Sequence, residues 1–279
     1  MGQRKHHVST LESAAAVLRL FTEERAELSV TEAHRLLSMP KSSVARLLQS
    51  MKDAGFLDPV EGTRRYQLGL LILDVSRMQR ARTPLADLAE EALAEICKTT
   101  GHTGYVSVLD GTDIVVLRVR PGTRALQVVT PLGQRMNAFE TAIGRSLLSR
   151  LSDDQVRSRY TEPLHPSSSN SPLTLDELLA LLAEVRKRGW AESIEEALPG
   201  VGSTAVAILS QHNNEMLGLC VSYSASHSSK EERQHLAELL REAAIHVGRK
   251  VDDPYWITHS TTKPGKNLRL AQDTNAGER

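Results

Sequence analysis

The chain has 279 residues, 40% of them hydrophobic, and this length predicts about two domains with cores of their own. Its 34 Lys and Arg balance its 34 Asp and Glu, although residues 1–80 hold 12 basic against 9 acidic residues and residues 81–258 hold 18 against 23. So small a basic excess excludes nucleic-acid binding by nonspecific electrostatics alone, and a dimer with base contacts would have to contribute.

Residues 29–53 have the pattern of two helices separated by a tight turn. Pro40 suits the first position of the second helix, where a missing N–H costs nothing. Apolar residues at the i, i+3, i+4, i+7 spacing form one face of this helix: Val44, Leu47, Leu48 and Met51. The opposite face is short, polar and cationic, as a helix that approaches DNA bases requires. The DNA-contacting residues that this face predicts are Lys41, Ser42, Ser43, Ala45, Arg46 and Gln49.

Segments on both sides complete a small domain. A preceding apolar stripe predicts a first helix, with Leu11, Ala14, Ala15, Leu18 and Phe21. Residues 55–58 and 64–68 predict two strands around the turn at 61–63. We interpret this hairpin as a wing whose tip carries Arg64 and Arg65, which can contact phosphates or enter a minor groove. The alternative is a small helical domain in which Arg46, Arg64 and Arg65 are solvated surface charge.

Two apolar helical patterns follow, at residues 70–78 and 85–96, with Pro84 between them. Because proline opens a helix but does not continue one cleanly, they predict a helical linker with a kink or break at Pro84. The apolar faces are too extensive for a lone exposed linker. We therefore predict a homodimer or tetramer that reads a palindromic site, with the domain boundary near residue 80.

Strand patterns begin near residue 100. Residues 105–109 and 114–119 flank an Asp-Gly turn and predict a hairpin. The elements expected after it are a strand at 126–130, a helix at 139–151, two helices opened by capping boxes at 152–155 and 174–177, strands at 205–210 and 216–224, and a helix at 230–250. A sheet flanked by helices in this order is an α+β domain.

The cysteines and the two ends of the chain allow a prediction of the cellular compartment. Cys97 and Cys220 form no CxxC arrangement, which predicts a reduced, cytoplasmic chain. The start is polar and basic, and no stretch approaches 18 consecutive apolar residues, so secretion and membrane insertion are not expected. The tail after Trp256 is polar and is predicted to be disordered.

No motif for catalysis or for a metal stands out. His235 and His246 could share a helix face, but no local spacing supplies further ligands for zinc. The pattern at residues 200–202 lacks the third glycine of a dinucleotide loop. The acidic pair Glu195-Glu196 fits a turn better than a general acid and base. We predict no catalytic residue, no metal and no cofactor.

Several motifs over residues 8–252 resemble those of the IclR-type bacterial transcriptional regulators. They are Pro40-Lys41-Ser42-Ser43-Val44 with Arg46-Leu47-Leu48, Tyr66-Gln67-Leu68-Gly69, Thr141 to Leu148, Arg188-Gly189-Trp190-Ala191 with Glu195-Glu196 and Gly200, and Val221-Ser222-Tyr223-Ser224. The organisation that the resemblance implies is a flexible N-terminus at 1–7, a winged helix-turn-helix domain at 8–70, a helical linker at 71–99, a GAF-like effector-binding domain at 100–252 and a disordered tail at 253–279. It also implies a dimer or tetramer that controls a catabolic operon in response to a small metabolite. We expect a repressor, and an activator is the alternative.

The resemblance also implies an effector pocket. The residues to which it points are Leu126, Val128, Ala142, Ile143, Ser193, Ser203, Ser222 and Ser224. Several relatives hold an acidic residue where Ser193 stands and a cysteine where Ser203 stands, so an organic-acid pocket does not transfer directly. A helix N-terminus near residues 140–144 would offer N–H groups to an anion, and we expect a small anionic or polar catabolite.

Two other functions fit the same pattern. In the first, residues 100–250 catalyse a reaction on a metabolite and the winged helix is an appended regulatory domain. In the second, the C-terminal part serves only to oligomerise the protein. A closed core with no cavity between Leu126, Ile143 and Ser222 would favour this second alternative.

Overall fold

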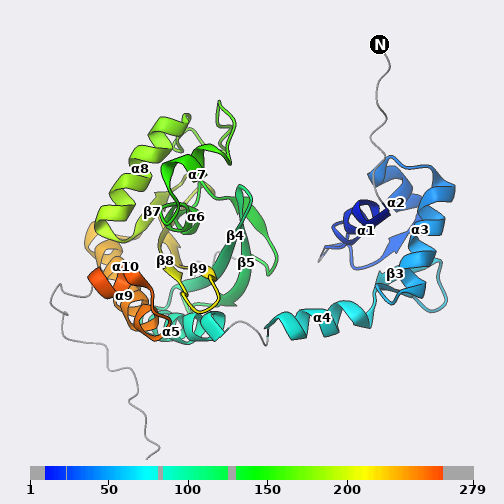
Figure 1. Cartoon of the computed structure of the whole chain (residues 1–279), viewed down its shortest axis with the longest axis horizontal. Coiled ribbons are helices and arrows are strands. Elements are labelled where there is room, and N and C mark those ends of the chain that lie inside the picture. The colour runs from blue at the N-terminus through cyan, green and yellow to red at the C-terminus, as the bar shows by residue number, and fades with distance from the viewer. Residues whose placement is uncertain (1–9, 23, 81–83, 125–129, 260–279) are drawn as a thin grey trace, which may run out of the picture. The chain divides into compact units, whose positions relative to one another are not determined.

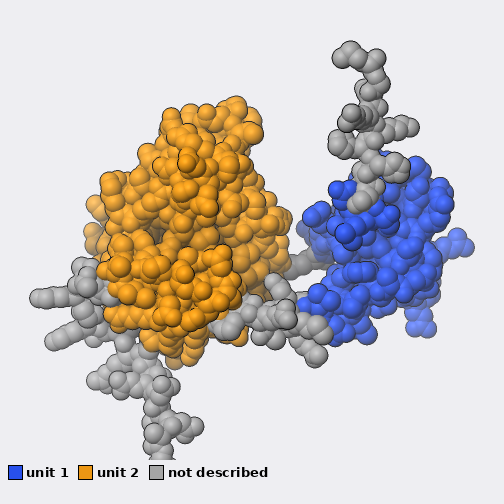
Figure 2. Space-filling view, viewed as in Figure 1, with its two compact units in different colours: residues 1–83 blue, residues 84–279 orange. Residues whose placement is uncertain are grey.

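The computed structural model describes residues 10–22, 24–80, 84–124 and 130–259. The chain divides into two compact units, residues 1–83 and residues 84–279 (Figures 1 and 2). One hydrophobic cluster forms the core of the first unit, and two clusters form the core of the second. The fold belongs to the α+β class, as the sequence predicts.

The first unit consists of short helices and a small sheet. Its elements are α1 (Thr10–Leu18), β1 (Leu28–Ser29), α2 (Val30–Leu37), α3 (Lys41–Asp53), β2 (Leu57–Pro59), β3 (Arg65–Leu68) and α4 (Leu70–Arg80). The strands pair antiparallel in the order β1-β3-β2. The predicted helix-turn-helix and hairpin are therefore present. The sequence does not predict β1, because two residues carry no detectable period.

The core of this unit confirms the predicted apolar face of α3. Val44, Leu47, Leu48 and Met51 are all buried. The predicted stripe on the first helix is partly wrong: Leu11 is 80% exposed, whereas Ser13 and Val17 are buried. Helix α1 ends at Leu18 and also turns Ser13 and Val17 to the core, whereas Ala14, Leu18 and Phe21 of the predicted stripe do pack against it.

The second unit is built on one six-stranded sheet. Its elements are α5 (Pro84–Thr100), β4 (Thr103–Asp110), β5 (Asp113–Arg120), β6 (Arg135–Asn137), α6 (Ala142–Leu148), α7 (Asp153–Arg157), α8 (Leu175–Arg188), β7 (Ala191–Ile194), β8 (Val201–Leu209), β9 (Met216–Ser224), α9 (Lys230–Lys250) and α10 (Pro254–Thr258). Every pairing is antiparallel, in the order β6-β5-β4-β9-β8-β7. This unit therefore has three layers, with helices on both faces of the sheet (Figure 1).

The two core clusters lie on opposite faces of this sheet. One packs α5, α9 and α10 against β4, β8 and β9, and the other packs α6, α7 and α8 against the opposite side. Helix α5 therefore belongs to the second unit. Its apolar side chains are buried there, among them Leu85, Leu93 and Ile96. The expectation that residues 85–96 present a linker face to a second subunit is wrong, because this unit's own core already covers that face.

Several other predictions for the second unit need correction. The predicted strand at 126–130 lies mostly outside the described residues, and Thr130 is not in a strand. The helix expected at 139–151 is shorter, because the Thr141 hydroxyl caps it by accepting from the Gly144 N–H at 3.1 Å. The sequence does not predict β6, β7 and α10, since three to five residues are too few to show a period. The predicted capping boxes at Ser152 and Thr174 are confirmed.

Helix α10 fastens the end of the described chain to the sheet. Trp256 is buried, and its indole N–H donates to the Ala207 carbonyl at 2.8 Å. Just before the helix, fully buried Asp253 accepts from the Leu209 N–H at 2.8 Å and pairs with Arg150. The hydrogen bonds of Asp253 and the buried side chain of Trp256 thus hold this segment in the second unit. The prediction of a disordered tail from residue 253 is therefore wrong for residues 253–259.

Candidate functional site

The polar face of α3 is held outward by the buried face behind it. Lys41, Ser42, Arg46 and Gln49 are exposed, and Ser43 and Ala45 are half-buried. The structure thus brings all six predicted residues to one helix. Pro40 precedes this helix instead of opening it, and its carbonyl accepts from the Ser43 and Val44 N–H groups at 2.9 and 3.0 Å. The prediction for Pro40 is wrong by one position.

The turn before α3 is tight and locally bonded. Ser38 adopts a left-handed conformation with φ of 52°, which lets the chain reverse between the two helices. The His34 ring nitrogen Nδ1 lies 2.6 Å from the Met39 carbonyl oxygen. These contacts fix the start of α3 against α2, the geometry by which a helix-turn-helix presents its second helix.

The polar side chains of this face differ in whether they already contact another side chain. Arg46 makes no ion pair within the described residues. The Gln49 amide donates to Asp53 at 2.8 Å one helical turn away, which orients the amide along the exposed face. A guanidinium without a partner carboxylate is available for a bidentate contact to a guanine edge.

The wing carries two arginines with different surroundings. Arg64 is exposed and makes no ion pair within the described residues. Arg65 lies in β3, 3.0 Å from Glu27 and 2.9 Å from Glu32. The prediction that both arginines lie at a free tip is therefore wrong: Arg65 connects the sheet to the start of α2, and Arg64 alone remains available for a phosphate.

Glu32 is the centre of that connection. Its carboxylate accepts from the Ser29 N–H at 2.8 Å and from the Ser29 hydroxyl at 2.7 Å, and Ser29 caps α2 in return. The hydrogen bonds from Ser29, assisted by Arg65, lower the pKa of Glu32 to about 2. The carboxylate therefore stays ionised at neutral pH and holds Arg65 in place.

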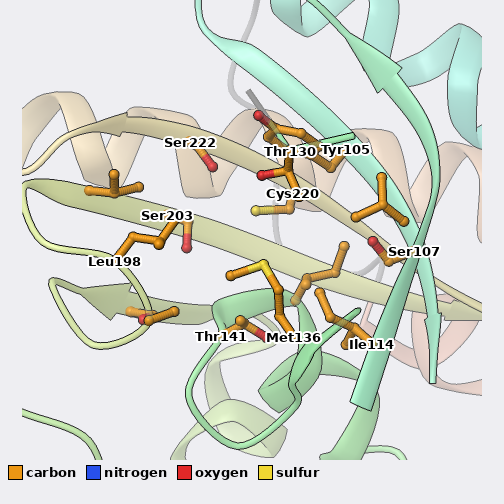
Figure 3. A pocket seen from close by; sticks show the side chains of 15 residues that line it. Tyr105, Ser107, Ile114, Thr130, Met136, Thr141, Leu198, Ser203, Cys220 and Ser222 are labelled. Atoms are coloured by element: carbon orange, nitrogen blue, oxygen red, sulfur yellow. The ribbon is translucent and has the colours of Figure 1, made fainter. Parts of the chain in front are cut away.

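The second unit contains a cavity of about 50 Å³ between the sheet and α6 (Figure 3). Its lining is apolar side chains interspersed with hydroxyls and one thiol: Tyr105, Ser107, Ile114, Val116, Thr130, Met136, Thr141, Ile143, Ser193, Ala197, Leu198, Val201, Ser203, Cys220 and Ser222. A larger and more polar hollow of about 530 Å³ shares Thr130, Met136, Ala197 and Leu198 with it. The cavity therefore has an adjoining vestibule.

The structure brings four of the eight predicted effector residues into this lining. They are Ile143, Ser193, Ser203 and Ser222. Ala142 is buried in the core beside the cavity and does not line it. Ser224 lies farther along β9, where its hydroxyl is 3.0 Å from the His227 ring nitrogen Nδ1. Leu126 and Val128 lie outside the described residues.

Some polar groups of the lining already have hydrogen-bond partners. The Ser193 hydroxyl donates to the Glu140 carbonyl at 2.8 Å. Burial raises the pKa of the Cys220 thiol to about 12, and the Ser222 and Ser203 hydroxyls only partly oppose this shift, so the group remains an uncharged S–H. Ser107 differs from these: its hydroxyl is fully buried and has no partner within the described residues.

The cavity is electrically neutral. None of the described residues that line it carries a formal charge. Arg145 on α6 is nearby, but its guanidinium donates to the Phe139 carbonyl at 2.7 Å and pairs with Glu196. The expected anion site at the start of α6 gains no support here, because the Thr141 hydroxyl occupies the Gly144 N–H and no cation of the described lining joins it.

The Arg145–Glu196 pair also holds the loop that closes the cavity. Ala197 and Leu198 follow Glu196 directly and belong to the lining. The Ser171 hydroxyl donates to the Glu196 carbonyl at 3.3 Å from the other side. The acidic pair for which the sequence predicts an exposed turn thus contains a largely buried member with a structural partner 51 residues away.

Comparisons with known proteins decide the family. Residues 79–249 match the model described as bacterial transcriptional regulator IclR C-terminal, and residues 10–61 match the IclR helix-turn-helix domain. The chain belongs to the IclR family. Members are DNA-binding transcriptional regulators, and the chain is one of them.

Named relatives cover nearly the whole chain. The transcriptional regulator KdgR of Escherichia coli is 28% identical over 85% of this chain and 90% of its own length. The acetate operon repressor of Salmonella typhimurium is 26% identical over 86% of this chain and 89% of its own length. Both are regulators, so the alternative of an enzyme with an appended winged helix gains no support.

A solved structure shares the fold. An IclR homolog from Microbacterium hydrocarbonoxydans, complexed with 4-hydroxybenzoate, is 18% identical and matches with a TM-score of 0.76 over 88% of this chain and 99% of that chain. No helix in the described part of the present chain is long and apolar enough to cross a membrane. The described residues also contain no group of three or more His, Cys, Asp or Glu side chains that could hold a metal ion.

Proposed function

We propose that this regulator binds operator DNA through the exposed face of α3, with Arg64 contacting the backbone. The observation that carries the proposal is the division of α3 into a buried apolar face and an exposed face with an Arg46 that makes no ion pair within the described residues. Arg46, Gln49 and Ser42 would read base edges in the major groove, and Lys41 would contact a phosphate. The remaining predicted residues, Ser43 and Ala45, are small and permit close approach.

Selection of binding sites from random DNA tests this proposal for any operator sequence. Wild-type protein should enrich one sequence, and Arg46→Ala should relax the choice at one base position by about 1–3 kcal/mol. Lys52→Ala is a matched control, since this residue is on the same helix near its other end. An Arg46→Ala variant that enriches the same sequence equally well would contradict the assignment.

We infer that operator binding requires a homodimer, which could pair into a tetramer, on a palindromic site. The support is α4, on which Leu70 is 72% and Leu73 66% exposed. Exposed leucines at helical spacing are typical of a surface that another subunit covers. Since the face of α5 is buried in its own unit, the contact would come from α4. Sedimentation at micromolar concentration tests the oligomeric state.

The second unit would bind a small polar catabolite in the cavity between the sheet and α6. A hydroxyl-rich lining with an apolar wall is typical of a small-molecule site, and it does not fit a module that only oligomerises. The homolog that holds 4-hydroxybenzoate shares this fold, which is consistent with a ligand here. Ile143, Ser193, Ser203 and Ser222 would line the site.

Effector binding would change operator affinity, and the protein would act in the bacterial cytoplasm as a repressor of a catabolic operon. One relative is named as an operon repressor. Coupling would pass through the Pro84 region between the two units. Because linkage is reciprocal, operator DNA must shift effector affinity by the same factor, typically about 5–150-fold. Calorimetry with pathway metabolites, with and without the selected DNA, tests this; equal affinities in both titrations would refute the coupling.

A further inference from the structure

The exposed face of α3 carries an acidic residue, Asp53, beside the residues proposed to read bases. The exposed side chains opposite the buried face follow one another at spacings of four, three and four positions: Ser42, Arg46, Gln49 and Asp53. Residues three and four apart are neighbours on a helix surface, so this spacing places them in one row. A carboxylate in this row needs a physical explanation, because DNA phosphates repel it.

Neither helix stability nor an ion pair accounts for the carboxylate of Asp53. It is the last residue of α3, where the helix dipole disfavours a negative charge. Among the residues that the structure describes, no cation pairs with it. It does accept a hydrogen bond at its Oδ1 from the Gln49 amide nitrogen Nε2, at 2.8 Å. The effect of Asp53 in the structure is therefore to orient the Gln49 amide.

A partner that only accepts hydrogen bonds determines which end of the Gln49 amide faces it. An ionised carboxylate attracts the amide nitrogen Nε2 and repels the amide oxygen Oε1, so the oxygen lies away from Asp53. One N–H and the oxygen then remain for a base edge. This donor and acceptor match the N7 acceptor and the N6 amino group of adenine, whereas guanine presents two acceptors. Without Asp53, the amide could rotate by a half turn and present the two groups in the opposite order.

We propose that Asp53 is a positioning residue that makes Gln49 selective for adenine in the operator. This inference rests on the proposed function of α3. The hydrogen bond orients the amide before DNA arrives, so less conformational freedom is lost when the base is bound. The negative charge also weakens the attraction to phosphates that every DNA sequence shares. Asp53 thus raises the ratio of specific to nonspecific binding in two ways, by orienting Gln49 and by repelling other sequences.

A double-mutant cycle with the full chain, on the operator obtained by site selection, tests this role. Gln49→Ala first identifies the base pair that Gln49 reads, as the position where a preference for adenine disappears. Asp53→Ala should reduce the preference at that position by about 3–10-fold, a part of the roughly 5–150-fold that one bidentate contact provides. Preferences at the other positions should stay as they are. In the Gln49→Ala background, Asp53→Ala should change no base preference.

Glu61→Ala is the matched control, because Glu61 is an exposed acidic residue in the turn of the wing. Glu61→Ala and Asp53→Ala each remove one negative charge from the first unit, so both should bind nonspecific DNA more tightly. Glu61→Ala should nevertheless keep every base preference. Thermal unfolding should show little change in Asp53→Ala, since the substitution also removes an unfavourable charge from the end of α3.

Several results would overturn the positioning role of Asp53. They are a base other than adenine at the position that Gln49 reads, an adenine preference unchanged in Asp53→Ala, an equal loss of preference in Glu61→Ala, and a loss that persists in the Gln49→Ala background. A Tm several degrees lower in Asp53→Ala would also overturn it. Failure of the proposed function looks different, because Arg46→Ala and Gln49→Ala would then both select the wild-type sequence, and both proposals would be refuted.

Discussion

Alanine substitutions at the two neighbouring arginines of the wing should have different effects, one on the stability of the first unit and the other on DNA binding. Arg65 is 3.0 Å from Glu27 and 2.9 Å from Glu32, and it donates to the Glu27 carbonyl at 3.2 Å. Partly exposed ion pairs contribute roughly 0.2–1 kcal/mol each, and the hydrogen bond adds about 1 kcal/mol. Arg65→Ala should therefore cost the first unit about 1.5–3 kcal/mol. Arg64→Ala should cost it almost nothing, because Arg64 makes no ion pair within the described residues.

Amide hydrogen exchange on the full chain measures this destabilisation in the first unit alone. A decrease of about 1.5–3 kcal/mol lowers protection in α2 and α3 by roughly 10–150-fold. DNA binding as a function of salt gives the complementary measurement. Arg64→Ala should reduce the slope of log K against log salt by about 0.9 for each phosphate that Arg64 neutralises, on any DNA sequence. If Arg65→Ala reduced the slope equally and left protection unchanged, the assignment of Arg65 to the network with Glu27 and Glu32 would be refuted.

Three further predictions concern pH, the core and assembly. Burial lowers the pKa of His102 below 6.5, so as the pH falls the unfolded state binds the proton before the folded state does. The free energy of unfolding should therefore decrease as the pH drops below about 6.5. Urea titrations should show that His102→Asn weakens this pH dependence. Trp256→Ala should destabilise the second unit by about 3–5 kcal/mol in calorimetry, because the buried indole is removed, whereas Leu173→Ala on the surface should change stability by less than about 0.5 kcal/mol. Leu73→Glu should dissociate the proposed dimer in sedimentation runs, and an unchanged sedimentation coefficient would exclude α4 from the interface.

The elements that the sequence predicts well are those with a long period or a strong local signal. The apolar face of α3 repeats over two turns, β9 spans nine residues of strand-forming sequence, and two capping boxes mark the starts of α7 and α8. The short strands β6 and β7 carry no such signal. The sequence predicts α5 as a helix but not its place in the second core, because an apolar face alone does not say which surface will cover it.

In the candidate sites, too, the sequence predicts which residues share one helix but not which distant residues come into contact. Residues on one helix, such as Ser42, Arg46 and Gln49, are placed together by helical geometry. The contacts of Arg65 with Glu32 and of Arg145 with Glu196 join residues 33 and 51 positions apart, and no local pattern reveals them. Ser107 does carry a signal, since it is a lone hydroxyl within an apolar strand, but only the folded strand shows that it faces the cavity.

The anchoring of α10 has a practical consequence for anyone who trims this protein. The match to the family's C-terminal domain ends at residue 249, which makes that position an obvious place to end an expressed fragment. A fragment ending there would lack Asp253, leave the largely buried Arg150 without its carboxylate, and expose the sheet surface that Trp256 covers. Such a fragment should aggregate or unfold, whereas one that ends after residue 259 keeps both contacts. The boundary of sequence similarity and the boundary of the folding unit are therefore about ten residues apart.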